Sequence, residues 1–109
     1  LNNWYPGEIL DDPRYTEKNV SLLAARGARA FRDYTPIAFD PADPDRIFRN
    51  VRWGPSVELF ILDKRSYRGP NTPNRQPERS GATALLGDAQ LDWLKRKLVE
   101  SRATWKVMC

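Results

Sequence analysis

The first half of the chain alternates apolar and polar residues in two different patterns. Apolar residues recur at helical spacing from Val20 to Phe31, which predicts a helix with Thr16 as its N-cap and an end before Pro36. The residues from Ile47 to Trp53 instead alternate with the period of two that is typical of a strand. A turn at Trp53–Ser56 follows this strand and precedes further apolar residues, so the pattern predicts a hairpin with a four-residue connection.

The second half of the chain predicts a strand, a helix and another strand. Val57–Leu62 is almost entirely apolar, which indicates a strand that is buried on both faces. After a long loop, leucines at helical spacing predict a helix over Asp88–Glu100, and Trp105–Cys109 begins a further strand. A strand, helix and strand in this order form a βαβ unit, whose two strands lie parallel in one sheet. We therefore predict an α/β fold built from a hairpin and a βαβ unit.

A parallel sheet is stable when helices cover it and several strands contribute to it. The pattern provides only three or four strands and two helices, and the last predicted strand stops at Cys109. We therefore expect residues 1–109 to be an internal fragment of one larger layered α/β enzyme domain, unable to perform that enzyme's chemistry alone.

The composition excludes several kinds of site and structure. The chain has 109 residues, no His and a single Cys, so it cannot form an internal disulfide, and a zinc site made only from this chain is not expected. No apolar run approaches the roughly 18 residues of a membrane span. The net charge of +4 fits either an ordinary solvated surface or attraction to anions.

The loop after the predicted strand Val57–Leu62 holds the strongest candidates for anion binding. Ligands of open α/β sheets bind at the carboxyl ends of strands, where Asp63, Arg65 and Arg68 lie. The planar guanidinium group of arginine matches the oxygens of a phosphate. A structural alternative is an ion pair between Asp63 and Arg65, with Arg68 solvated.

The adjacent residues Asn2 and Asn3 are candidates for binding a metal ion. The side-chain oxygen of asparagine can bind hard cations such as calcium. Asparagine is also a common turn residue, so the same pair is explained by turn formation alone.

Four segments resemble, in order, conserved blocks of the alkaline phosphatase D (PhoD-like) metallophosphatase family. The N-terminal segment is similar to the end of the family's W-D-D-H-E-x-x-N-N-W block, and a later one is similar to an apolar strand followed by D-x-R-x-Y-R. Two more are similar to its L-G-x-x-Q-x-x-W-L helix start and to its A-x-W-K/N-V strand. The segments are Leu1–Trp4, Phe60–Asn71, Leu86–Leu94 and Ala103–Val107.

This resemblance implies a four-layer calcineurin-like metallophosphoesterase sandwich that hydrolyses phosphate monoesters or diesters. It implies iron and calcium as cofactors and water activated by these metals as the nucleophile. Asn2 or Asn3 would be a metal ligand, and Arg65 and Arg68 would bind the substrate phosphate. The D-D-H-E residues and a later His-containing block of the family are not in this chain, so we expect it to be inactive by itself. The resemblance also implies a secreted or periplasmic protein.

Two other functions fit the same residues. The first is a small basic module without catalysis, which would use the Arg-rich loop 64–79 to bind nucleic acid or an acidic partner, although the resemblance makes nucleic acid a less favoured partner. The second is a relative that keeps the phosphatase fold but has lost its metals.

Overall fold

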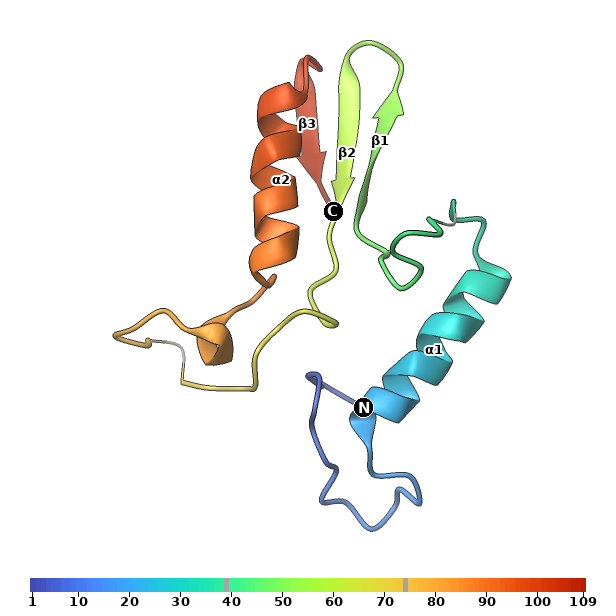
Figure 1. Ribbon diagram of the computed structural model, residues 1–109, viewed down its shortest axis with the longest axis vertical. Coiled ribbons are helices and arrows are strands. Elements are labelled where there is room, and N and C mark those ends of the chain that lie inside the picture. The colour runs from blue at the N-terminus through green and yellow to red at the C-terminus, as the bar shows by residue number, and fades with distance from the viewer. Residues whose placement is uncertain (39, 74) are drawn as a thin grey trace.

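A computed structural model of the chain describes residues 1–38, 40–73 and 75–109. Asn74, inside the predicted Arg-rich loop, lies outside the described residues. Figure 1 shows helix α2 alongside the strands, whereas α1 lies away from the sheet, on the side where β1 begins, next to the N-terminal segment. The elements are α1 (Val20–Tyr34), β1 (Arg49–Trp53), β2 (Val57–Ile61), a 3-10 helix (Gly81–Thr83), α2 (Asp88–Glu100) and β3 (Trp105–Met108). Within the described ranges, no helix is long and apolar enough to cross a membrane.

The strands form one sheet in the order β1-β2-β3. Strands β1 and β2 pair antiparallel, and β2 and β3 pair parallel across the connection that contains α2. The predicted hairpin and βαβ unit are therefore confirmed. Trp53 pairs with Val57, so three residues rather than the predicted four join the hairpin, and Gly54 among them has a φ of 64°. Glycine adopts this left-handed conformation without the steric cost that a side chain would add.

The start of α1 differs from the prediction, and its end agrees with it. The N-cap is Asn19, whose side-chain oxygen accepts a hydrogen bond of 3.3 Å from the backbone nitrogen of Leu22, so the assignment to Thr16 was wrong. A short antiparallel bridge pairs Asn19 with Ile9, and the helix begins directly after it, three residues later than a cap at Thr16 predicts. The helix ends at Tyr34, before Pro36 as predicted.

The core lies between α2 and one face of the sheet. Phe48, Phe60, Trp93 and Leu94 are buried together there. The ring centroid of Phe48 lies 4.9 Å from that of Trp93 and 5.3 Å from that of Tyr67, the distances of aromatic pairs in contact. Strand β2 is thus fixed to α2 directly before the loop that carries Arg65 and Arg68.

The opposite face of the sheet is apolar and largely open. Side chains that pair across the strands form two rows on it, Trp53–Val57–Trp105 and Val51–Leu59–Val107. Trp53 is 75% exposed and Trp105 is 67% exposed. The prediction that β2 is buried on both faces is therefore confirmed for one face only, because Leu59 and its neighbours on the second face remain partly exposed.

One charged residue lies on the covered face of β2. Glu58 is buried, and its carboxylate accepts hydrogen bonds from Ser101 Oγ at 2.5 Å and from Asn50 Nδ2 at 2.6 Å. The bond from Ser101 and then that from Asn50 lower the pKa of Glu58 below its usual value of 4.5. The ionised carboxylate of Glu58 on β2 thereby connects β1 and the segment after α2 by hydrogen bonds.

We expect Glu58→Gln to reduce stability near neutral pH and to have less effect in acid. Because folding lowers the pKa of Glu58, its stabilising contribution is present above the unfolded-state pKa and disappears as the pH falls through the lowered folded-state pKa. Urea unfolding of the full-length wild-type protein and of the variant at several pH values tests this, with the exposed Glu78→Gln as control. A difference between wild type and Glu58→Gln that stays constant down to acid pH would contradict the prediction.

Candidate functional site

The loop after β2 is shaped by the carboxylate of Asp63. Asp63 Oδ1 accepts hydrogen bonds from the backbone nitrogens of Arg65 at 2.8 Å and of Ser66 at 2.9 Å. The carboxylate therefore closes a tight turn, which is a common role of aspartate. The alternative of an ion pair between the Asp63 and Arg65 side chains does not occur among the ion pairs of the described residues.

The end of β2 is fixed to the start of α2 by Gln90, which is fully buried. Gln90 Oε1 accepts a bond of 2.7 Å from the backbone nitrogen of Asp63, and Gln90 Nε2 donates to the carbonyl oxygens of Asp63 at 2.7 Å and of Leu86 at 3.0 Å. Buried backbone groups need such partners, since leaving them unpaired is costly. The side chain of Gln90 thus sets the position from which the arginine loop starts.

Both predicted arginines converge on one predicted asparagine. Arg65 Nη1 donates to Asn3 Oδ1 at 2.8 Å, and Arg68 Nη1 donates to the same oxygen at 2.9 Å. The structure therefore brings Asn3, Arg65 and Arg68 together, although more than sixty residues separate Asn3 from the arginines. Asn2 is exposed beside this cluster.

The cluster carries two positive charges on neutral partners. Arg65 also donates to the carbonyl oxygen of Trp4 at 3.4 Å, and Arg68 Nη2 donates to Asn71 Oδ1 at 2.9 Å. None of the ion pairs formed within the described residues includes Arg65 or Arg68. Two guanidinium groups held together without a carboxylate create a local positive potential that attracts an anion.

An apolar groove of about 380 Å³ lies next to Arg65. Its walls include the predicted apolar face of α1 together with Trp4 and Ile47. Asp63 borders the groove, and its second carboxylate oxygen, Oδ2, is buried without a hydrogen-bond partner in the described part of the chain. The groove therefore joins an apolar wall to the polar side chains of the loop.

The described residues do not by themselves match a metal site. They contain no group of three or more His, Cys, Asp or Glu side chains that could hold a metal ion. The side-chain oxygen of Asn3 already accepts two guanidinium N–H groups, so a cation bound to this oxygen would have to displace at least one arginine.

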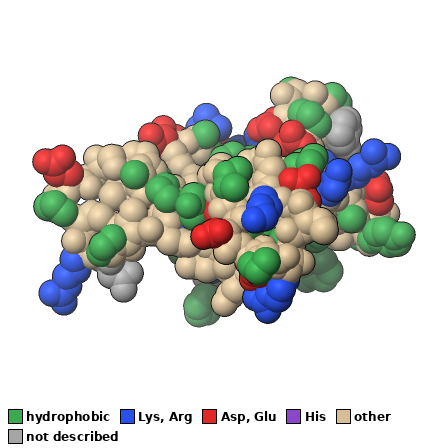
Figure 2. All heavy atoms as spheres, turned by 90° about the horizontal axis from the view of Figure 1, so that it is seen from below, with side chains coloured by type: hydrophobic (Ala, Val, Ile, Leu, Met, Phe, Trp, Pro, Cys, Tyr) green, Lys and Arg blue, Asp and Glu red, His purple; other side chains and the backbone are tan. Residues whose placement is uncertain are grey.

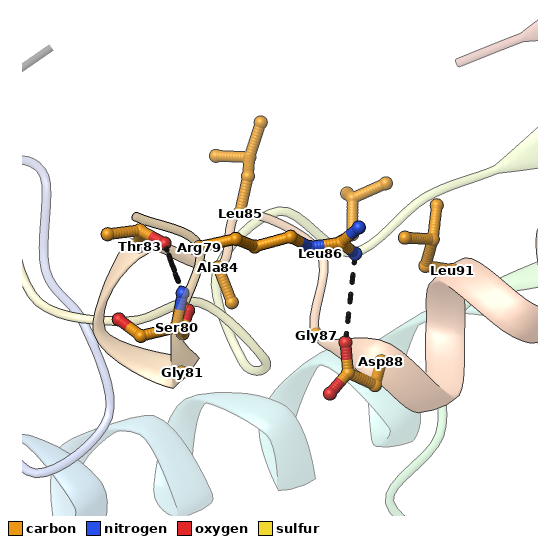
Figure 3. A pocket seen from close by; sticks show the side chains of 10 residues that line it. All are labelled: Arg79, Ser80, Gly81, Thr83, Ala84, Leu85, Leu86, Gly87, Asp88 and Leu91. Atoms are coloured by element: carbon orange, nitrogen blue, oxygen red, sulfur yellow. Dashed lines mark hydrogen bonds and ion pairs between the residues drawn. The ribbon is translucent and has the colours of Figure 1, made fainter. Parts of the chain in front are cut away.

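A second hollow, of about 480 Å³, lies around the start of α2. Figure 3 shows Arg79 reaching across it to Asp88, with a distance of 3.9 Å between the charged groups. Ser80 and Thr83 at its edge are joined by a hydrogen bond of 2.9 Å. Its lining includes none of the four predicted site residues, so we place the candidate site at the arginine cluster instead.

The arginine loop is also held by close backbone packing at Gly69. The backbone nitrogen of Gly69 donates to the carbonyl oxygen of Ala84 at 2.8 Å. A Cβ atom at residue 69 would lie 2.5 Å from the carbonyl oxygens of Gly81 and Ala82, which leaves space only for glycine. The backbone after Arg68 is thus fixed against the segment that leads into α2.

Sequence reasoning missed the roles of Asn71 and Gln90. Asn71 was seen only as part of a turn-rich loop, and nothing local indicates that it contacts Asn3. Gln90 offered a weak signal, because it is a polar residue one turn before the buried Leu94 on the packed side of α2.

The comparisons with known proteins give one positive result. A family model described as PhoD-like phosphatase matches residues 1–109, the whole chain. No curated protein and no solved structure matches it.

Proposed function

We propose, since the chain belongs to the PhoD-like phosphatase family, that it is an internal part of a metal-dependent phosphoesterase. This enzyme would hydrolyse phosphate monoesters or diesters and, like the family it resembles, act outside the cytoplasm as a secreted or periplasmic protein. The observation that supports the proposal most is the pair of guanidinium groups of Arg65 and Arg68 on Asn3 Oδ1, at 2.8 and 2.9 Å.

Arg65 and Arg68 would bind and orient the phosphate group of the substrate. Guanidinium groups form two parallel hydrogen bonds with phosphate oxygens, and both charges here are free of carboxylate partners within the described residues. The bonds to Asn3 fix the position of both groups before substrate arrives, which lowers the entropy cost of binding. Iron and calcium, when bound elsewhere in the enzyme, would supply activated water and neutralise the phosphate oxygens. We assign no proton transfer to either arginine.

The Asn2–Asn3 pair would give at most one amide oxygen to a metal. Asn2 is the better candidate of the two, because the oxygen of Asn3 already accepts two guanidinium N–H groups. Asn3 would then hold the arginines while Asn2 reaches toward the metal.

The open apolar face of the sheet supports the proposal of a larger layered domain. Its rows Trp53–Val57–Trp105 and Val51–Leu59–Val107 form a continuous apolar surface of the kind that marks an interface. We place a further layer of the same domain on this face, as in the four-layer sandwich of calcineurin-like phosphoesterases. Tryptophan side chains contribute most to such interfaces, because each buries a large area.

We expect a polypeptide of residues 1–109 alone to show no phosphatase activity when iron or calcium is added. The described residues contain no group of carboxylate, His or Cys side chains that could hold a metal ion, so a metal-bound nucleophile would lack its ligands. Hydrolysis of p-nitrophenyl phosphate over a range of metal concentrations measures this, with the full-length protein as the positive control. Metal-dependent turnover by the isolated polypeptide would contradict the proposal.

Measurements on the same polypeptide distinguish the proposed phosphatase fragment from the alternative of a basic binding module. A module should unfold in one cooperative thermal transition and bind nucleic acid with an affinity that falls steeply with salt. Figure 2 shows Lys and Arg side chains interspersed with acidic and hydrophobic ones on the face seen there, rather than gathered in one basic stripe. We expect instead a chain with expanded, non-cooperative packing and no salt-sensitive binding to nucleic acid.

A further inference from the structure

Asn71 joins the N-terminal segment to the arginine loop through three hydrogen bonds. Its Oδ1 accepts from Asn3 Nδ2 at 3.0 Å and from Arg68 Nη2 at 2.9 Å, and its Nδ2 donates to the carbonyl oxygen of Asn3 at 2.9 Å. The side chain of Asn71 therefore uses both its donor and its acceptor group within the cluster. Asn3 and Asn71 are 68 residues apart in the sequence, so their hydrogen bonds join two distant segments of the chain.

The bond to the backbone of Asn3 fixes an uncommon conformation. Asn3 has a φ of 57°, in the left-handed region that few residues other than glycine enter. Asparagine tolerates this conformation, and the bond from Asn71 Nδ2 to the Asn3 carbonyl holds it. The side chain of Asn3 is thereby aimed at both guanidinium groups.

We propose that Asn71 is a positioning residue for phosphate binding, which acts by fixing Asn3 and Arg68. This inference rests on the proposed function of the arginine pair. The guanidinium group of Arg68 spans two amide oxygens, Asn3 Oδ1 and Asn71 Oδ1, at 2.9 Å each. Its plane is set by these two bonds.

A neutral side chain at residue 71 keeps the charge of the cluster available. An amide oxygen accepts a hydrogen bond from Arg68 without cancelling its positive charge, whereas a carboxylate at the same place would form an ion pair with it. Asn71→Asp keeps the acceptor for Arg68, removes the donor to Asn3 and adds a negative charge. Asn71→Ala removes all three bonds and adds no charge.

The experiment measures competitive inhibition by inorganic phosphate in the full-length enzyme. We expect Asn71→Ala to raise the inhibition constant about 10-fold and Asn71→Asp to raise it about 10- to 100-fold, as losses of charge-assisted hydrogen bonds do. KM should rise in parallel while kcat changes less. Added salt should reduce the excess effect of Asn71→Asp, because salt screens exposed charges. The exposed neighbour Thr72→Ala is the control.

The possible results separate this inference from the proposed function. The wild-type enzyme could hydrolyse phosphate esters while the Asn71 variants keep the wild-type inhibition constant for phosphate. This result would overturn the inference about Asn71 and leave the proposed phosphatase function intact. Equal effects of Ala and Asp at all salt concentrations would overturn the role of the neutral amide. A lower melting temperature with unchanged phosphate inhibition would show a purely structural contact. Wild-type enzyme without hydrolysis would overturn both proposals.

Discussion

Changing Arg65 or Arg68 to Ala in the full-length enzyme is expected to lower kcat/KM for phosphate esters by about 10- to 100-fold each. A hydrogen bond to a charged group contributes about 1.5–3 kcal/mol, which corresponds to this range. The double variant should lose less than the product of the two effects, because both guanidinium groups donate to Asn3 Oδ1 and depend on each other.

Lysine variants and a neighbouring residue provide the controls. Arg65→Lys and Arg68→Lys keep the charge and lose the planar fork, so their kcat/KM should lie between those of wild type and the Ala variants. Lys64→Ala removes an exposed positive charge from the same loop and should have a much smaller effect. Equal losses for Lys64→Ala and the arginine variants would mean that the general charge of the loop matters and the cluster does not.

Gln90→Leu should destabilise the full-length protein by at least about 3 kcal/mol, since three polar groups lose their partner and each buried polar group left unpaired costs about 1–3 kcal/mol. The change leaves the backbone nitrogen and oxygen of Asp63 and the carbonyl oxygen of Leu86 without their partner. Because Asp63 begins the arginine loop, phosphate affinity should fall as well. The midpoint of urea unfolding and the inhibition constant of phosphate measure the two effects.

Two further substitutions test whether the hydrogen bonds of Gln90 cause these effects. Gln90→Glu keeps an acceptor for the backbone nitrogen of Asp63 but places a buried carboxylate against the two carbonyl oxygens, so near neutral pH it should destabilise the protein at least as much as Gln90→Leu. Lys95→Leu places the same apolar side chain on the exposed side of α2 and should change stability little. An unfolding midpoint of Gln90→Leu that equals that of wild type would refute the role of the buried amide.

The elements of the second half of the chain could be predicted because their signals are local. Helix α2 covers Asp88–Glu100 as predicted, with its apolar residues at helical spacing, an acidic residue in the first turn and a basic residue in the last. The position of Arg65 and Arg68 at the end of β2 follows from the βαβ order alone. Their meeting with Asn3 was suggested only by the resemblance, which made both segments part of one site.

The remaining features depend on contacts between distant segments. Thr16 and Asn19 are both good N-cap residues, and the bridge from Ile9 to Asn19 decides between them. Gln90 bonds to Asp63 across 27 residues, so its place on the packed side of α2 suggests burial but does not reveal its partner. Full burial of β2 was predicted from apolar content alone, which does not say how many layers are present to cover it.

Two contacts, one at Gly69 and one at Asn71, hold the backbone of the arginine loop in place. Asn71 bonds to Asn3, and Gly69 packs against Gly81 and Ala82 in the 3-10 helix that precedes α2. Insertions or deletions in the segment 72–80 would lengthen or shorten the rim of the site while Arg65 and Arg68 keep their places. Under the proposed function, a change in the length of this loop would alter the surroundings of the arginine pair without moving the arginines themselves.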